Sequence, residues 1–161
     1  MATPLRRETR VRAPTPQELD RVAELWLALL RHHAAAGPRF EPGPEASEHL
    51  RAELRAWSRS ADVRIAVAVD EQLVGFCIAR ILRRSELFRE TSRGEIDSIF
   101  VPVAYRGRGI ARQLVEDALA WLRREGIRRV ELSVDATNPE GRAFWRRTGF
   151  EPAMDVLERR L

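Results

Sequence analysis

The sequence has no lysine, so all 28 of its basic residues are arginine. Against 24 acidic residues they leave a formal net charge of only +4 at pH 7. An excess this small favours an anionic partner through long-range steering, but it does not separate a phosphorylated cofactor from nucleic acid. The arginines are spread among acidic residues, with no basic tail and no recognition motif, so we expect no nucleic-acid binding.

Cysteine and long hydrophobic runs are also scarce. Cys77 is the single cysteine, which excludes an internal disulfide and a cysteine-based zinc cluster. It lies in a strand-like run, so we expect a buried structural thiol. Uncharged apolar runs such as 66–69 are far too short to cross a membrane. The N-terminal segment has no apolar core behind its charges, so we expect no secretory signal, a cytoplasmic location and no membrane partner.

The length and the pattern of apolar residues predict one α+β domain over residues 1–161. Strands are predicted at 9–13, 63–69, 73–82, 95–101, 128–134 and 150–161, the last as a strand or strand pair. Helices are predicted at 15–35, 46–59, 110–125 and 138–147, with Thr15, Glu18 and Asn138 at helix starts and Gly126 at a helix end. The order β-α-α-β-β-β-α-β-α-β predicts a mixed sheet flanked by about four helices.

The segment from Val101 to Ala111 has the pattern of a strand, a short loop and a helix. The strand ends at Pro102, two glycines then alternate with arginines, and an apolar-periodic helix begins at Ile110. This arrangement places unpaired backbone N–H groups at a helix N-terminus, where the helix dipole is positive. Such a place binds phosphate, and neighbouring guanidinium groups strengthen the binding.

Two segments carry a family resemblance. Residues 106–111, Arg-Gly-Arg-Gly-Ile-Ala, match the acetyl-CoA signature Q/R-x-x-G-x-G/A of the GNAT superfamily of N-acetyltransferases. Residues 138–150, with Asn138, Phe144, Trp145, Gly149 and Phe150, are similar to its second signature, N-x-x-A-x-x-L/F-Y-x-x-x-G-F. The distance between the two segments and the order of elements also agree with this superfamily. The chain therefore resembles a GNAT N-acetyltransferase, which implies a splayed, mostly antiparallel sheet.

The resemblance implies acetyl-CoA as the co-substrate and no metal. The amides from Arg106 to Ala111 would wrap the pyrophosphate, where Gly107 and Gly109 allow close approach of the backbone. The pantetheine arm would pair with the end of the preceding strand. The cofactor-binding residues implied in this way are Ile99, Phe100, Val101, Arg106, Gly107, Arg108, Gly109, Ile110, Ala111, Arg112, Asn138 and Trp145. The arginine side chains are equally well explained as solvated, and Asn138 as a helix cap.

Acetyl transfer to an amine needs a base, because a free primary amine is mostly protonated at pH 7. Glu95 and Asp97 lie two apart on one strand and are predicted to project from one face, beside Ile99 and Val101. The resemblance implies that one of the two carboxylates is the catalytic base. The alternative is that both are surface carboxylates paired with nearby arginines such as Arg93.

Trp145 stands where members of this superfamily often carry a tyrosine that protonates the leaving thiolate. An indole N–H cannot act as an acid near neutral pH. A thiol has a pKa of about 8.5, so the thiolate leaves without much help. We therefore expect acetyl transfer without a dedicated tyrosine acid, and we expect Tyr105, the single tyrosine, to pack against the helix.

The resemblance implies an acceptor pocket between the first two helices and the loop before the fourth strand. His33, Phe40 and Phe88 are the predicted lining residues for an amine-bearing acceptor, either a small molecule or a peptide or protein amine. Two alternatives stay open, a sensor that binds acetyl-CoA without catalysis and, with less support, a nucleic-acid-binding protein. A homodimer through the edge formed by 156–161 is a further expectation.

Overall fold

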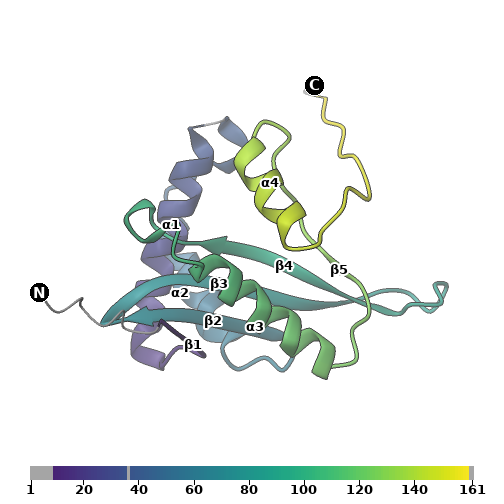
Figure 1. The fold of residues 1–161 in the computed structure, drawn as a ribbon, viewed down its shortest axis with the longest axis horizontal. Helices are drawn as coiled ribbons and strands as arrows, with labels where there is room; N and C mark the ends of the chain where they lie inside the picture. The colour runs from purple at the N-terminus through teal and green to yellow at the C-terminus, as the bar shows by residue number, and fades with distance from the viewer. Residues whose placement is uncertain (1–8, 36, 160–161) are drawn as a thin grey trace, which may run out of the picture.

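The structure is a computed structural model in which residues 9–35 and 37–159 are described. Five strands form one sheet in the order β1-β2-β3-β4-β5 (Figure 1). The strands are β1 (Arg10–Arg12), β2 (Val63–Asp70), β3 (Gln72–Arg83), β4 (Ser92–Phe100) and β5 (Val130–Glu131). Neighbours from β1 to β4 are antiparallel, whereas β4 and β5 are parallel. The mixed, mostly antiparallel sheet predicted from the sequence is thus confirmed.

Within residues 9–35 and 37–159, four α-helices and three short 3-10 turns accompany the sheet. The helices are α1 (Leu19–Ala34), α2 (Ala46–Trp57), α3 (Ile110–Arg124) and α4 (Pro139–Arg147), and the turns are η1 (Pro16–Glu18), η2 (Pro38–Phe40) and η3 (Val103–Tyr105). The predicted helix boundaries are confirmed by Thr15, whose N–H donates to Glu18 Oε2 at 2.8 Å, and by Gly126, which ends α3 at φ +76°. Among the described residues, no helix is both long and apolar enough to span a bilayer.

The core is divided by the sheet into two layers. On one face, α3 packs against Ala66 and Ala68 of β2, and on the other face α1 and α2 pack against Ile65 and Val67 of the same strand. Successive residues of a strand point to opposite faces, so both faces of β2 are covered. The small alanines lie on the α3 side, where they let the helix approach the sheet closely.

A β-bulge at Asp97 changes the phase of β4. Ile96 pairs with Ala79 of β3, whereas the next pair joins Ser98 to Ile78, so Asp97 is an extra residue on this strand. Before the bulge Ile96 belongs to the α3 layer, and after it the odd-numbered Ile99 and Val101 do. The prediction that Glu95 and Asp97 lie beside Ile99 and Val101 on one face is therefore wrong, because the bulge turns the later pair to the opposite face.

The parallel contact between β4 and β5 is short. It consists of Gly94 opposite Val130 and Glu95 opposite Glu131, and the Gly94 N–H donates to Arg129 O at 2.8 Å. Beyond these residues the two strands diverge (Figure 1). The β5-side edge of β4 from Ile96 to Phe100 is thereby left without a strand partner within the described part of the chain, as a splayed sheet requires.

The C-terminal end departs from the sequence prediction. β5 has two residues where a strand over 128–134 is predicted, and residues 150–159 form no strand. Residues 160 and 161 lie outside the described residues. A two-residue β5 offers no ladder on which a further strand can pair, and Pro152 lacks an N–H to donate. The edge predicted to form a homodimer is therefore not a strand over 156–159, where Val156 and Leu157 are exposed.

Candidate active site

The loop before α3 has the backbone geometry of an anion site. Gly107 and Gly109 have φ values of +74° and +77°, and a Cβ at either position would meet nothing within 4 Å. Their conformation, rather than crowding, therefore demands glycine. The first helical hydrogen bond is donated by Gln113 N–H to Gly109 O at 3.1 Å. The amides of 107–112 precede this bond at the positive end of the helix dipole, so they form a cradle for an anion.

The three predicted arginines of this loop differ in how they are held. Arg106 Nε donates to Val101 O at 3.0 Å, at the end of β4. Arg108 lies over the Tyr105 ring, 5.4 Å from its centroid, and 3.9 Å from an Asp70 carboxylate oxygen. Arg112 pairs with Glu116 at 2.9 Å on the exposed side of α3. Arg106 is thus the best placed to contact a phosphate, because a neutral carbonyl positions it and a carboxylate holds each of the others.

Tyr105 fastens the loop to the rest of the fold. Its hydroxyl accepts a hydrogen bond from Gln72 Nε2 at 2.6 Å, and its ring packs against the α3 layer of the core. This agrees with the expectation that Tyr105 packs against the helix, since that layer contains Ile110 and Leu114 of α3. Its role is to anchor the loop to the start of β3.

The second signature lies on α4 and caps its start. Asn138 Oδ1 accepts from Gly141 N–H at 2.8 Å, so the predicted helix-cap role is confirmed. Trp145 is buried, with ring centroids of Phe144 and Phe150 at 5.0 and 5.3 Å. Its indole belongs to the apolar core between α4 and the sheet. Contact of either residue with a cofactor stays a prediction.

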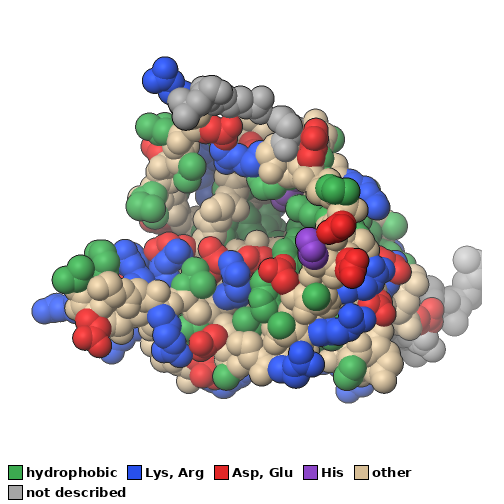
Figure 2. All heavy atoms as spheres, turned by 180° about the vertical axis from the view of Figure 1, so that it is seen from behind, with side chains coloured by type: hydrophobic (Ala, Val, Ile, Leu, Met, Phe, Trp, Pro, Cys, Tyr) green, Lys and Arg blue, Asp and Glu red, His purple; other side chains and the backbone are tan. Residues whose placement is uncertain are grey.

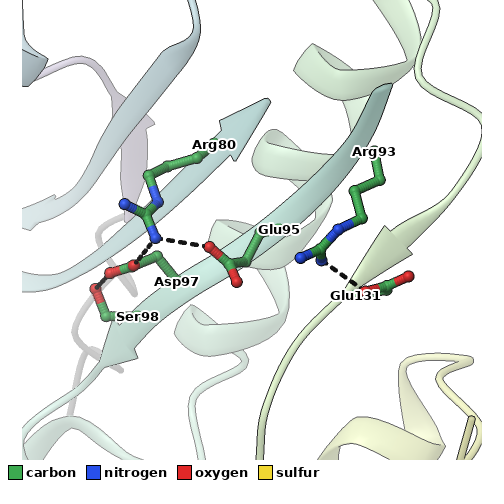
Figure 3. A network of polar contacts seen from close by, with 6 residues as sticks. All are labelled: Arg80, Arg93, Glu95, Asp97, Ser98 and Glu131. Atoms are coloured by element: carbon green, nitrogen blue, oxygen red, sulfur yellow. Dashed lines mark hydrogen bonds and ion pairs between the residues drawn. The ribbon is translucent and has the colours of Figure 1, made fainter. Parts of the chain in front are cut away.

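Both candidate bases are bound by one arginine (Figure 3). Arg80 of β3 places Nη2 at 2.7 Å from Glu95 Oε2 and at 2.8 Å from Asp97 Oδ1. The two carboxylates therefore do share one face of β4, as predicted. Arg93, the arginine expected to pair with them, instead binds Glu131 of β5 at 2.6 Å.

Asp97 and Glu95 occupy different surroundings. The Asp97 side chain is 17% exposed and that of Glu95 25%, so Asp97 is the more buried carboxylate. Burial raises the pKa of Asp97 above its usual value, while the charge of Arg80 and a hydrogen bond from the Ser98 hydroxyl at 3.1 Å act against that rise. A carboxylate with a raised pKa is a better proton acceptor than an ordinary aspartate, which favours Asp97 for the role of a base.

The predicted acceptor residues are only partly brought together. His33 and Phe40 lie edge to face, with ring centroids 5.1 Å apart, and burial lowers the pKa of His33. Phe88 lies in the β3–β4 connection, which projects beyond the end of the sheet away from the α1–α2 connection (Figure 1). The structure therefore does not bring Phe88 together with the other two. The physical reason is that β3 and β4 stay paired to Arg83 and Ser92, which carries the connection outward.

A hollow opens above the sheet when the molecule is seen from behind, with hydrophobic side chains deep inside and charged side chains of both signs along its lower rim (Figure 2). The α1–α2 connection reaches the C-terminal segment through an ion pair between Arg39 and Glu158. His33 also interacts electrostatically with Asp135, which follows β5. These contacts bring the end of α1 close to the segments that flank α4.

Comparison with known families agrees with this geometry. The model described as the acetyltransferase (GNAT) family matches residues 26–150. The chain belongs to this family. A mycothiol acetyltransferase of Beutenbergia cavernae is 33% identical over 152 residues, which cover 94% of this chain and 48% of that protein. The GNAT chain therefore spans about half the length of this curated relative.

Solved structures of GNAT proteins share the fold. The aminoglycoside N-acetyltransferase AAC(6')-Iy, solved in complex with CoA, has a TM-score of 0.81 and 18% identity and covers 99% of both chains. A predicted acetyltransferase of Clostridium acetobutylicum, solved with acetyl-CoA, has a TM-score of 0.79 and 14% identity, covering 95% of this chain and 96% of that one. At these identities the likeness shows the fold.

Sequence reasoning missed Arg80, although this GNAT chain carries a signal for it. Arg80 is the single charged residue in the otherwise apolar stretch 73–82. A charge in the middle of a buried strand needs a partner, and here the partners are Glu95 and Asp97. Its neighbours on α2, Trp57 and Glu53, were also missed, because no local pattern relates a helix residue to a strand that follows it. Among the described residues, no group of three or more His, Cys, Asp or Glu side chains is placed to hold a metal.

Proposed function

We propose that this GNAT chain is an N-acetyltransferase that transfers an acetyl group from acetyl-CoA to a primary amine by direct attack in a ternary complex. The observation that carries the proposal is the layout of β4. This strand presents a partly buried carboxylate, Asp97, on the α2 side and leads directly into the glycine loop before α3. One strand thereby joins a proton acceptor to an anion cradle.

The residues of the loop fit the phosphates of coenzyme A. Gly107 and Gly109 have left-handed backbone conformations, and no atom lies within 4 Å of the position a Cβ would take at either of them. The amides of 107–112 are therefore accessible at the N-terminus of α3. Arg106, Arg108 and Arg112 supply positive charge around this cradle. The unpartnered edge of β4 from Ile99 to Val101 is suited to an extended pantetheine arm, which would bind as an added strand. Asn138 and Trp145 border this edge from α4 in the proposal.

Acetyl-CoA supplies an activated acetyl group: the amine nitrogen forms a bond to the acetyl carbon while the C–S bond breaks and coenzyme A leaves as a thiolate. Asp97 accepts the proton that the ammonium form of the acceptor must lose, either directly or through a water molecule. Glu95 accepts a hydrogen bond from Arg80 at 2.7 Å. Trp145 is buried and is no acid, so solvent protonates the thiolate, whose conjugate acid has a pKa of about 8.5.

The charges that face Asp97 favour a cationic acceptor. Three carboxylates, those of Glu53, Glu95 and Asp97, act on this region together with one guanidinium, that of Arg80. The resulting negative balance attracts an ammonium group before it is deprotonated. His33 and Phe40 contribute an aromatic wall at the end of α1. Mycothiol acetyltransferase and aminoglycoside acetyltransferase, the relatives named above, illustrate the range of acceptors within the family.

A thiol-release assay tests the proposal. Acetyl-CoA is incubated with the protein and with neamine, spermidine or a short peptide that has a free N-terminus, and released coenzyme A is measured with a thiol reagent. Release with one of these amines, lost in Asp97→Asn and kept in Glu95→Gln, is the expected result. The assay has little protein background because the single thiol, Cys77, is buried.

One outcome would contradict the proposed activity, and another would contradict the assignment of the base. If acetyl-CoA raises the melting temperature but no amine releases coenzyme A, the chain is a sensor of acetyl-CoA. The tryptophan at position 145 is the feature that favours this second candidate. If Glu95→Gln abolishes turnover and Asp97→Asn does not, the enzyme assignment stands and the base is Glu95.

A further inference from the structure

Arg80 is tied to the two carboxylates more closely than a surface ion pair requires. One nitrogen, Nη2, lies within 2.8 Å of both Glu95 Oε2 and Asp97 Oδ1. The guanidinium also lies over the indole of Trp57 on α2, 5.3 Å from the ring centroid. Figure 3 shows the guanidinium between the two carboxylates, on the strand that neighbours them. The arginine is therefore fixed from β4 and from α2 at once.

The Nε of Arg80 is buried and has no hydrogen-bond partner within the described structure. A buried donor that makes no hydrogen bond is costly, and such groups in native proteins call for an explanation. An ion pair that served only to connect two segments would not need to bury an unpaired donor. The exposed pair of Arg83 with Asp62, at 3.0 Å, connects the end of the same strand to the loop before β2 without such a donor. The placement of Arg80 is instead explained by its effect on the carboxylates.

We propose, on the basis of the function proposed above, that Arg80 is a positioning residue that gives Glu95 and Asp97 different roles. It holds Glu95 through a directed hydrogen bond, and it turns Asp97 toward the acceptor while its positive charge favours the ionised form of Asp97. Without this charge, two partly buried carboxylates on one strand would disfavour each other's ionised form.

The groups that face Asp97 come from three elements. β3 contributes Arg80 and the buried thiol of Cys77, β4 contributes Glu95 and the Ser98 hydroxyl, and α2 contributes Glu53. Burial and the two glutamates disfavour the charged form of Asp97, whereas Arg80 and Ser98 favour it. Arg80 is the only positive charge among these groups, so its removal should raise the pKa of Asp97.

Direct titration by NMR tests this role independently of any acceptor. The side-chain carboxyl 13C shift of Asp97 is followed against pH in the wild-type protein, in Arg80→Gln, in Arg80→Lys and in Arg83→Gln. We expect Arg80→Gln to raise the titration midpoint of Asp97 by about one pH unit or more, because an opposite charge at this distance shifts a carboxyl pKa by about 1–3 units. Arg80→Lys should restore most of the shift, and Arg83→Gln, on the same strand, should cause none.

The pH profile of kcat/KM extends the test to turnover with whichever amine of the panel is acetylated. On the acid limb of the profile, kcat/KM of Arg80→Gln should fall about tenfold for each pH unit by which the Asp97 midpoint rises. Raising the pH should recover this loss. Binding of acetyl-CoA should be unchanged, since Arg80 is held by Glu95, Asp97 and Trp57, whereas the glycine loop begins only after β4 has ended.

Each result separates the role of Arg80 from the proposed function. If the Asp97 midpoint does not move in Arg80→Gln, or if the variant loses turnover equally at all pH values, Arg80 is a structural brace and the inference is overturned. If the midpoint moves but no amine is acetylated by the wild-type protein, the proposed function fails while the electrostatic role stands. Should Arg80→Gln not fold, Arg80→Lys and Glu95→Gln keep the test, since Glu95→Gln must lower the Asp97 midpoint.

Discussion

Gly94 of β4 lies directly against Leu122 of α3, so closely that a Cβ on the glycine would come within 2.8 Å of Leu122 Cδ1. The same glycine is opposite Val130, and its N–H donates to Arg129 O. The residue that sets the distance between helix and sheet is therefore also the point from which β4 and β5 diverge.

Substitution of Gly94 by alanine should destabilise the protein by about 1–3 kcal/mol, the usual cost of an overpacked core. The leucine that must move is fully buried and has little free space around it. Urea unfolding measures the loss. Gly43→Ala is the matched control, since a Cβ there meets nothing within 4 Å, and an equal loss in both variants would contradict the packing argument.

The two ends of α3 offer a matched pair of glycines. Gly109 and Gly126 have φ values of +77° and +76°, and a Cβ at either would meet nothing within 4 Å. Alanine at each position should therefore cost a similar free energy of unfolding, about 1–2 kcal/mol for the left-handed conformation. Only Gly109→Ala should weaken acetyl-CoA binding, as measured by calorimetry. Equal weakening in both variants would mean that binding follows the stability of the helix rather than the amide cradle.

Replacing Asp97 with asparagine should separate activity from stability. Turnover should fall by about 10²–10⁴-fold, the usual contribution of a general base. Because burial raises the pKa of Asp97, its contribution to stability is greatest at low pH and is lost as the pH rises through the folded-state pKa. The melting temperature of Asp97→Asn at pH 8 should therefore be no lower than that of the wild type.

The matched control for this change is Asp62→Asn, which breaks the exposed pair with Arg83 and should leave turnover intact. A fall of several degrees in the melting temperature of Asp97→Asn at pH 8, with none at pH 5, would contradict the sign of the argument. It would mean that the ion pair with Arg80 outweighs the cost of burying the charge.

The contribution of Glu18 to stability should depend on pH in the opposite way. A hydrogen bond from Arg12 and one from the Thr15 N–H lower its pKa from 4.5 to about 2. A lowered pKa contributes stability above the unfolded-state value, and this contribution is lost as the pH falls from 4.5 toward 2. Glu18→Gln should therefore cost about 1 kcal/mol at pH 7, a value that allows for partial exposure of the pair.

Urea unfolding at a series of pH values checks this prediction, and the difference between Glu18→Gln and the wild type should vanish toward pH 2. Glu24→Gln is the control, because Glu24 forms an exposed pair with Arg21 at 2.7 Å that contributes little. A deficit of Glu18→Gln that stays constant with pH would show that the carboxylate charge is not its source.

Much of the fold follows from local patterns in the sequence. The apolar periodicity of α1 and α3, the cap at Asn138 and the stop at Gly126 are local signals, and each lies where it was predicted. The glycine loop was predictable for the same reason, since its signature is contiguous. The partner of Glu95 and Asp97 was not, because Arg80 reaches them across a strand pair whose register no local pattern fixes.

The C-terminal segment was mispredicted for a related reason. Apolar residues such as Met154 and Val156 give it the composition of a strand, but a strand exists only where a neighbour offers hydrogen bonds. β5 is too short to offer them. The bulge at Asp97 was also invisible, since an extra residue in one strand is defined only by its pairing with the other.

The bulge in β4 gives this strand two reading frames. Upstream of Asp97 the even-numbered side chains enter the α3 layer, and downstream the odd-numbered ones do. Straightening the bulge without removing a residue would bring the two halves into one frame and turn Ile99 and Val101 out of the layer they now fill. Anyone who redesigns this protein, or transplants its carboxylates onto another sheet, must therefore carry the bulge at Asp97 over with them.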